Sequence, residues 1–277
     1  MANPWSYAGK RVLVAGCYSG MGAATARIVG ELGAKVTGFD IKKPDYPLDQ
    51  FREVDLKDPA AIRSAIEATA ADGPLDTLFY CAGLSPVHPD ADVMSVNFLG
   101  LRETVEGCIP HIRRGGSIAT ISSGAGMGYL ASLGEVGEFL AIEDRSDAFE
   151  WIAGKGGTPG FNGYAFSKMC TIVYTLQRGA TLAPEKGIRI NCISPGPTAT
   201  PMMPDFIETA GAEFMKRYPR PLGGDSTPEE QAWILAFLGS DMAAALNGEN
   251  IFSDGGTSGG VMTGAIDPSV FMSAAES

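Results

Sequence analysis

Short apolar runs alternate with helix-forming segments along most of this chain. The apolar runs are RVLVAG at 11–16, KVTGFDI at 35–41, LDTLFYCAG at 75–83, SIATISS at 117–123, IRINCISPG at 188–196 and ENIFSDGG at 249–256. Segments with small and apolar residues on one helical face, such as MGAATARIVGELG, separate them. Continuous apolar strands joined by helices predict βαβ units. We therefore expect an α/β fold with one doubly wound parallel sheet of the Rossmann type, covered by helices on both faces.

The length fits a single domain over residues 1–277, and no repeat or low-complexity tract interrupts it. The net charge of −11 argues against nucleic acid or an anionic membrane as partner, because a uniformly acidic surface is repelled by both. The opening MANPWSYAGKR has no apolar core, and no later stretch is uninterruptedly apolar over about 18 residues. We expect a cytoplasmic protein.

The cysteines are odd in number, widely scattered and mostly set in apolar runs, which is typical of free thiols in a reducing compartment. No CxxC occurs, and His88 and His111 have no ligand-like spacing to each other or to a cysteine. We therefore expect no metal site. The five cysteines are Cys17, Cys81, Cys108, Cys170 and Cys192.

Two segments interrupt the alternation of strand and helix. Residues 124–162 separate a strand from its following helix by far more than an ordinary βα loop, and GEVGEFLAIEDRSDAFEWI within them has helical spacing. We expect an ordered helical insertion there. Residues 200–225 place prolines at both ends of an apolar helix-like stretch, whose commonest role is the buried stripe of a helix.

Glycines gather where the first strand passes into its helix. AGCYSGMG places Gly16, Gly20 and Gly22 at this turn. A phosphate that approaches the backbone N–H groups of a helix N-terminus needs residues without side chains, and the helix dipole favours its charge. Glycine-rich turns are common by themselves, but this position in a βαβ unit predicts a dinucleotide site. Cys17 and Tyr18 in the turn are best read as loop side chains, with a redox role for Cys17 as the weaker alternative.

Asp40 ends the second strand, roughly 20 residues beyond the glycines. A carboxylate there accepts hydrogen bonds from both hydroxyls of an adenosine ribose and repels a 2′-phosphate, which predicts NAD as the cofactor. The alternative is an aspartate that only caps a turn. Asp55 and Leu56 follow the third strand, at a position suited to the adenine.

Tyr164 and Lys168 are four positions apart in GYAFSKM, a stretch that forms helix by its pattern. Residues at this spacing share a helical face, about 5 to 6 Å apart at Cβ, so the ammonium can stabilise a phenolate. A chance pair on the surface is the alternative when the two residues are taken alone.

These motifs together resemble the short-chain dehydrogenase/reductase family, from residue 10 to SDGG at 253–256. The glycine spacing GxxxGxG is its dehydrogenase form, and CAGLSP resembles its NNAG segment, with Cys81 where asparagine is more usual. SVNFLG, ISS, YAFSK and SPGPTATP resemble its further motifs in the right order. Within the family, the chain is most similar to the bacterial 3α-hydroxysteroid dehydrogenase/carbonyl reductase branch.

The resemblance implies a catalytic tetrad of Asn97, Ser123, Tyr164 and Lys168, with Ser122 as the neighbour that could be confused with Ser123. Tyr164 would exchange the proton of the alcohol, Ser123 would orient its oxygen, Lys168 would favour the phenolate, and Asn97 would hold a relaying water. Thr200 would bind the nicotinamide carboxamide. The implied cofactor-binding residues are Gly16, Ser19, Gly20, Met21, Gly22, Asp40, Ile41, Asp55, Leu56, Cys81, Ala82, Gly83, Tyr164, Lys168, Pro195, Thr198 and Thr200.

The resemblance also makes residues 200–225 a substrate lid, since they follow the PG segment. We expect an enzyme that transfers hydride between NAD(H) and a secondary alcohol or ketone on a bulky apolar substrate, either steroid-like or alicyclic and aromatic. Members of the family imply a homodimer or homotetramer. The alternatives are a catalytically silent sensor or scaffold that binds dinucleotide, and an enoyl reductase, which normally has a wider spacing between tyrosine and lysine.

Overall fold

The computed structural model describes residues 3–158 and 160–271 and contains one parallel sheet of seven strands in the order β3-β2-β1-β4-β5-β6-β7. This is the doubly wound fold that the sequence predicts. The order reverses between β1 and β4, and in such sheets a ligand binds outside the carboxyl ends of the strands at this point. The strands are β1 (Arg11–Ala15), β2 (Lys35–Asp40), β3 (Gln50–Glu53), β4 (Leu75–Tyr80), β5 (Ile112–Ile121), β6 (Arg189–Pro195) and β7 (Glu249–Ser253).

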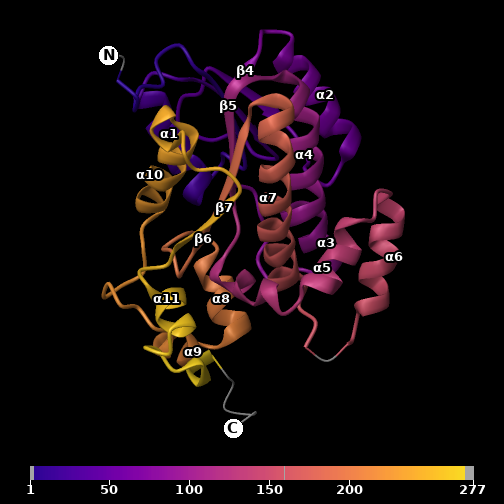
Figure 1. Ribbon diagram of the computed structural model, residues 1–277, viewed down its shortest axis with the longest axis vertical. Coiled ribbons are helices and arrows are strands. Elements are labelled where there is room, and N and C mark those ends of the chain that lie inside the picture. Colours follow the sequence, from indigo (N-terminus) through magenta and orange to yellow (C-terminus); the bar gives the residue numbers. More distant parts are fainter. Residues whose placement is uncertain (1–2, 159, 272–277) are drawn as a thin grey trace.

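Helices cover both faces of the sheet and enclose two apolar cores (Figure 1). One face carries α1 (Gly20–Glu31) and α10 (Pro228–Gly239), which contact each other. The other carries α2 (Pro59–Ala70), α4 (Leu101–Cys108) and α7 (Gly163–Lys186). Thr227 begins α10 with a capping box to Glu230, as its position before a proline predicts. Within the described ranges, 3–158 and 160–271, no helix is long and apolar enough to span a membrane.

The segment SVNFLGLRETVEGCIPHI at 95–112, whose pattern indicates one helix, is divided. It contains the π-helix η1 (Ser95–Gly100), then α4 and the short η2 (Ile109–His111), and α3 (Asp90–Met94) precedes it. Every residue of the π-helix is buried. A π-turn widens the helix and moves one residue out of the regular α-helical pattern, which periodicity alone does not reveal.

Residues 124–162 contain η3 (Gly124–Leu130), α5 (Leu133–Leu140) and α6 (Arg145–Lys155). Figure 1 shows α5 and α6 beside the lower half of α7, on the side away from the sheet. An aromatic cluster joins them to α7: the ring of Phe139 lies 5.4 Å from that of Phe166, and Trp151 stacks on Phe166 at 5.1 Å. Each such aromatic pair adds about 0.5–1.5 kcal/mol beyond the burial of its area.

The carboxyl end of the sheet lies at the bottom of Figure 1, together with α8 (Met203–Ala210), α9 (Ala212–Arg217) and α11 (Thr257–Met262). No residue of α8 or α9 is fully buried. The apolar side chains of residues 200–225 are therefore not the buried stripe of a core helix. Two short turns complete the described elements, η4 (Asp241–Ala243) and η5 (Pro268–Phe271).

Candidate active site

The glycine turn between β1 and α1 has no room for side chains. Gly16 has φ of 84°, and a Cβ there would collide with the backbone of Ala82. A Cβ on Gly22 would overlap the carbonyl of Gly16. A Cβ on Gly20 would only touch Thr200, but the φ of 56° there favours glycine. These constraints bring the backbone of the turn, the loop after β4 and the start of α1 close together.

The N-terminus of α1 fits a phosphate group. Ser19 stands at the N-cap in an extended conformation, and its side chain makes no capping hydrogen bond. The first N–H groups of a helix have no partner within it, and the dipole places partial positive charge there. The space beside this end of α1 stays open because Gly16 and Gly22 have no side chains. This end of α1 therefore suits the pyrophosphate of a dinucleotide.

Asp40 lies beside the glycine turn at the end of β2. Its Oδ2 accepts a hydrogen bond from the Tyr18 N–H at 2.9 Å, and its Oδ1 accepts one from the Lys42 N–H at 3.3 Å. The carboxylate thus does cap a turn, which was the alternative interpretation, and each oxygen keeps a further lone pair for a ribose hydroxyl. Ile41 beside it is exposed.

At the predicted adenine position, Asp55 is exposed, and its Oδ1 accepts a hydrogen bond from the Lys57 N–H at 2.9 Å. Leu56 is buried in the core, so its side chain is not available to a ligand.

A cavity of about 650 Å³ opens next to this region, at the carboxyl ends of β4, β5 and β6. Asp40, Asn97 and the turn glycines do not border it. It therefore corresponds to the nicotinamide and substrate end of the predicted site. The predicted site residues that line the cavity are Met21, Cys81, Ala82, Gly83, Ser123, Tyr164, Lys168, Pro195, Thr198 and Thr200.

Tyr164, Lys168 and Ser123 meet at the floor of this cavity. Lys168 Nζ lies 5.5 Å from the centroid of the Tyr164 ring and donates a hydrogen bond to the carbonyl of Ile121 at 3.0 Å. Ser123 follows β5 and lines the cavity with Tyr164, and its Oγ accepts a hydrogen bond from the Ala125 N–H at 3.2 Å. The Ser122 hydroxyl instead donates to the carbonyl of Lys168 at 2.8 Å. Ser123, not Ser122, is therefore the serine free to meet a substrate oxygen.

Burial is the largest influence on the pKa values of Tyr164 and Lys168. It raises the pKa of Tyr164 to about 12, and the hydrogen bond from Ser123 opposes this rise. Burial lowers the pKa of Lys168 to about 8. The nearby side chains of Cys192 and Cys81 raise this pKa and so partly offset the effect of burial. Without a bound dinucleotide, the Tyr164 phenol is thus neutral at ordinary pH and can donate its proton. Burial also raises the thiol pKa values of Cys17 and Cys81 to about 12, which argues against a redox role for Cys17.

Asn97 is held in the π-helix with its side chain turned to the loop after β4. Its Oδ1 accepts from the Leu84 N–H at 2.7 Å, and its Nδ2 donates to the Leu84 carbonyl at 3.0 Å. A Cβ on Gly83 would lie 3.4 Å from Asn97 Oδ1 and 4.0 Å from Lys168 Nζ. Asn97 therefore clamps the loop that contacts Lys168, and its side-chain amide is engaged in that contact.

Thr198 and Thr200 occupy different surroundings. The Thr198 hydroxyl donates to the Gly196 carbonyl at 3.0 Å and pairs with Ser226, so it braces its own loop. A Cβ on Gly20 would lie 3.5 Å from Thr200 Cγ2. Thr200 is accordingly placed between the helix N-terminus and the cavity, as a residue in contact with a dinucleotide would be.

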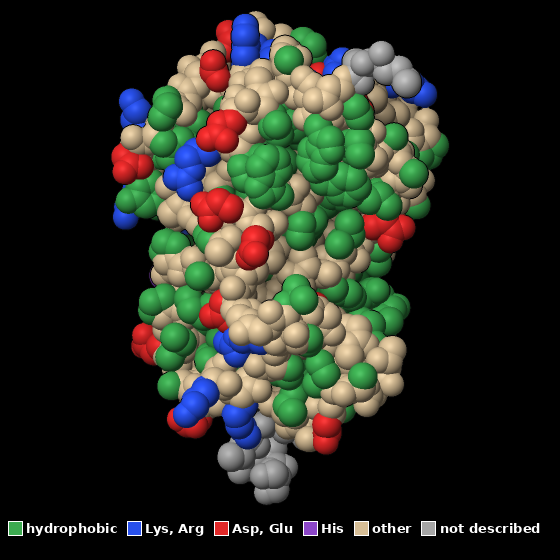
Figure 2. All heavy atoms as spheres, turned by 90° about the vertical axis from the view of Figure 1, so that its left-hand side faces the viewer, with side chains coloured by type: hydrophobic (Ala, Val, Ile, Leu, Met, Phe, Trp, Pro, Cys, Tyr) green, Lys and Arg blue, Asp and Glu red, His purple; other side chains and the backbone are tan. Residues whose placement is uncertain are grey.

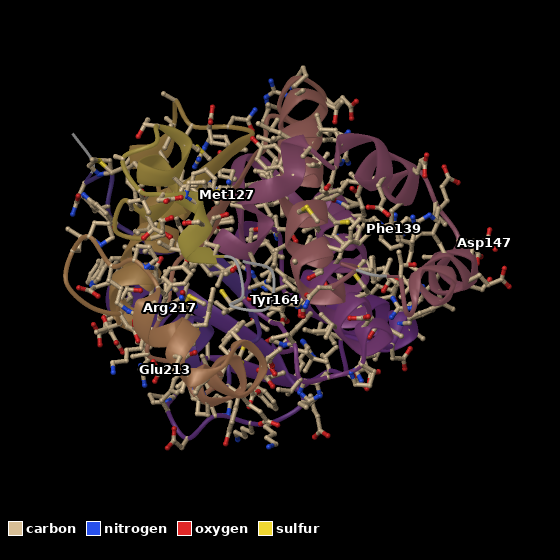
Figure 3. The ribbon with its side chains drawn as sticks, turned by 90° about the horizontal axis from the view of Figure 1, so that it is seen from below. Met127, Phe139, Asp147, Tyr164, Glu213 and Arg217 are labelled. Atoms are coloured by element: carbon tan, nitrogen blue, oxygen red, sulfur yellow. The ribbon has the colours of Figure 1, made fainter. Side chains whose placement is uncertain are left out.

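Side chains of the 200–225 segment, predicted as a lid, line the cavity, and they are joined there by residues that the sequence did not indicate. Phe206 of α8 meets Tyr164 with ring centroids 5.2 Å apart, and Tyr218 meets Phe271 at 5.3 Å. Figure 3, seen from below, shows Tyr164 near the middle with Met127 of η3 on one side and α9 on another. The unpredicted lining includes Gly124, Met127, Thr257, Ser258 and Phe271.

Comparison with protein families agrees with this geometry. A family model described as short chain dehydrogenase matches residues 10–134, and one described as Enoyl-(Acyl carrier protein) reductase matches residues 148–258. The two matches together cover most of the chain. The chain belongs to the short-chain dehydrogenase/reductase family. It is thus an oxidoreductase of a family that binds a nicotinamide dinucleotide.

Individual relatives are similar over nearly their whole length. The coniferyl-alcohol dehydrogenase of Pseudomonas sp. strain HR199 is 32% identical over 247 residues, which are 89% of this chain and 96% of the relative. The 3-alpha-hydroxysteroid dehydrogenase/carbonyl reductase of Comamonas testosteroni is 30% identical over 255 residues, 88% and 95% of the two chains. The crystal structure of the 3-alpha-hydroxysteroid dehydrogenase from Pseudomonas sp. B-0831 complexed with NADH superposes with a TM-score of 0.79 at 26% identity, covering 93% of this chain and 100% of that one.

Among residues 3–158 and 160–271, no group of three or more histidine, cysteine, aspartate or glutamate side chains could hold a metal ion.

Proposed function

We propose that this protein is an NAD-dependent dehydrogenase that interconverts a secondary alcohol and a ketone on a bulky apolar substrate. The observation that carries the proposal is the cavity of about 650 Å³, whose floor holds Tyr164, Ser123 and Lys168. Methionine and aromatic side chains form its opposite wall, and such walls adapt to a large hydrocarbon. They are Met127, Met202, Met203, Met215, Phe206, Phe214, Tyr218 and Phe271.

In the proposed reaction, Tyr164 exchanges a proton with the substrate oxygen. In ketone reduction its neutral phenol donates that proton, and in alcohol oxidation the phenolate accepts it. Ser123 hydrogen-bonds the same oxygen and orients it, while Lys168 contributes a positive charge 5.5 Å from the phenol ring. When bound, the dinucleotide supplies or accepts the hydride. Asn97 holds the loop at 81–86 in place and, as the family resemblance implies, retains a water for proton relay.

The preference for NAD over NADP rests on Asp40. Its carboxylate stands beside the glycine turn, where a 2′-phosphate on the adenosine ribose would meet a like charge. The similar 3-alpha-hydroxysteroid dehydrogenase from Pseudomonas sp. B-0831 was crystallised with NADH, which supports the assignment.

The second candidate function, a silent sensor or scaffold that binds dinucleotide, is less well supported, because Tyr164 and Lys168 are both present and adjoin the cavity. An enoyl reductase is less well supported for a different reason. Although one matching family model carries that description, the tyrosine and lysine here are four positions apart, and the spacing in enoyl reductases is normally wider.

One assay separates these functions. The protein is mixed with NAD⁺ and a panel of steroid, terpenoid and aryl alcohols, and NADH absorbance is followed. Formation of NADH with a bulky alcohol supports the dehydrogenase. Binding of NADH without turnover of any alcohol or ketone in the panel indicates the sensor, and reduction of an enoyl thioester in place of a ketone indicates the enoyl reductase.

We also propose a homodimer or homotetramer in a reducing compartment such as the cytoplasm. All five cysteines are free, which is compatible with that compartment. The insertion covers part of the surface of α7, so we propose that the contact between subunits uses another face. Hydrophobic side chains gather on the face that carries α1 and α10 (Figure 2), and Trp233 and Met242 there are 46% and 44% exposed. An exposed apolar patch of this kind is typical of a protein interface.

A further inference from the structure

One hydrogen bond ties α8 to the body of the protein. Ser85 Oγ donates to Asp205 Oδ2 at 2.5 Å, although the two residues are 120 positions apart. Ser85 is 1% exposed and belongs to the loop after β4, while Asp205 lies in the first turn of α8. A short O–H···O⁻ bond with a charged acceptor is roughly twice as strong as a neutral one.

No other described side chain of α8 or α9 makes a polar contact of this kind. None of their residues is fully buried, and their apolar side chains nearest the cavity, such as Phe206 and Phe214, are half-buried. In the part of the chain that the structure describes, Asp205 is the only side chain of α8 and α9 that hydrogen-bonds a residue outside 200–225. Loss of this bond would therefore loosen α8 while leaving the buried core contacts in place.

Both ends of the bond adjoin the cavity. On one side, Leu84 and Pro86 flank Ser85 and line the cavity, and Asn97 fixes Leu84 through two hydrogen bonds. On the other side, Phe206 follows Asp205 and meets the ring of Tyr164 edge-on. The bond thus joins the loop that borders the nicotinamide end of the site to the helix that covers it.

We propose that Ser85 and Asp205 form a latch that holds α8 closed over the cavity, keeps Phe206 against Tyr164 and limits the rate at which dinucleotide leaves. The proposal rests on the function proposed for residues 200–225 as a lid. The two residues are positioning residues, since they act through Phe206 and the loop at 81–86. Opening of such a cover often limits turnover in enzymes that close over their substrates.

The experiment measures the rate at which NADH dissociates and does not depend on catalytic turnover. Dissociation of NADH from the purified protein is followed by stopped-flow fluorescence for Ser85→Ala, Asp205→Ala and the double variant. We expect each single change to speed dissociation roughly tenfold, the scale of one lost hydrogen bond to a charged group. The double variant should dissociate no faster than the faster single variant, because both changes remove the same bond.

The matched control is Glu208→Gln, which removes a charge from the same helix. Glu208 is exposed and makes no hydrogen bond or ion pair with the described residues. NADH dissociation from this variant should equal that of the unchanged protein. Asp205→Asn keeps the size and the acceptor but not the charge, so it should fall between the unchanged protein and Asp205→Ala. It also serves as the test if Ser85→Ala does not fold.

A second readout is limited trypsin digestion at the exposed Lys216 and Arg217 of α9. Ser85→Ala and Asp205→Ala should speed cleavage there, and NADH should protect the unchanged protein better than either variant. Effects of the two substitutions on dissociation that multiply, or rates unchanged from the parent protein, would overturn the latch. Failure of the proposed function appears separately: a protein that binds NADH and shows the coupled effects, yet oxidises no alcohol in the panel, keeps the latch and loses the dehydrogenase assignment.

Discussion

The ring of Phe206 lies edge-on against the ring of Tyr164, with centroids 5.2 Å apart. Phe206 comes from α8, and Tyr164 comes from the first turn of α7. The phenol that we propose as the proton carrier is therefore in contact with α8, the first helix of the segment that we propose as a lid. Burial is also the largest influence on the pKa of Tyr164, which it raises.

Replacement of Tyr164 by Phe should lower turnover by roughly two to four orders of magnitude, because it removes the proton carrier and keeps the ring. NADH affinity, measured by fluorescence titration, should stay nearly unchanged. Tyr129→Phe is the control, since it removes a phenol hydroxyl that does not line the cavity. If Tyr164→Phe keeps more than about a tenth of the activity, the assigned role is wrong.

The unchanged protein should show a higher kcat/KM with NAD(H) than with NADP(H), owing to the charge of Asp40. Asp40→Asn keeps an acceptor for the Tyr18 N–H and removes that charge, so it should narrow the preference by roughly tenfold. Asp45→Asn, an exposed change in the loop that follows β2, is the control. Equal values for both cofactors in the unchanged protein would remove Asp40 from the site.

Burial of Lys168 predicts a pH-dependent stability. Its pKa is about 8 in the folded protein and 10.5 for a lysine exposed to water, so between these pH values the unfolded chain binds more protons than the folded protein. The free energy of unfolding should therefore gain a rising contribution from about pH 8 upward, which is absent below it. Urea unfolding of the unchanged protein and Lys168→Met at about pH 7 and about pH 9.5 checks this. A difference between the two proteins that does not change with pH would contradict it.

Substrate preference should follow apolar area. Burial contributes about 25 cal/mol for each Å² of apolar surface, so an alicyclic alcohol with fused rings should surpass a small polar hydroxy acid in kcat/KM. Phe206→Ala should lower kcat/KM by roughly tenfold for the large alcohol, with little change for the small one. If the small polar compound is the better substrate, the proposed substrate class fails, while membership of the dehydrogenase family stands.

Light scattering at micromolar concentration should detect a dimer or tetramer. Trp233→Glu places a charge in the apolar patch on the face of α1 and α10 and should shift the protein toward the monomer. Leu130→Glu is the matched change, because Leu130 is 65% exposed on η3, away from that patch. A strict monomer would refute the oligomer, and sensitivity to Leu130→Glu alone would move the interface to the insertion.

Much of the site could be predicted because its motifs are local. The turn at Gly16 and Gly22 requires glycine for steric reasons that any βαβ turn of this kind shares, and the spacing of Tyr164 and Lys168 follows from helix geometry. The choice between Ser122 and Ser123 could not be made locally. It depends on which of the two hydroxyls donates to the carbonyl of Lys168, a residue 46 positions later in the sequence than Ser122. Only the packing of α7 against β5 determines this.

The sequence by itself determined the alternation of strands and helices, the glycine turn and the shared helical face of Tyr164 and Lys168, because periodicity and backbone sterics act over a few residues. Only the tertiary structure decided how the site is covered. Phe206 against Tyr164, Ser85 bonded to Asp205 and Phe271 beside Tyr218 join segments that no local pattern relates. Such contacts arise because whole helices and loops pack together at the carboxyl edge of the sheet. The partner of each side chain there depends on this packing and not on its neighbours in sequence.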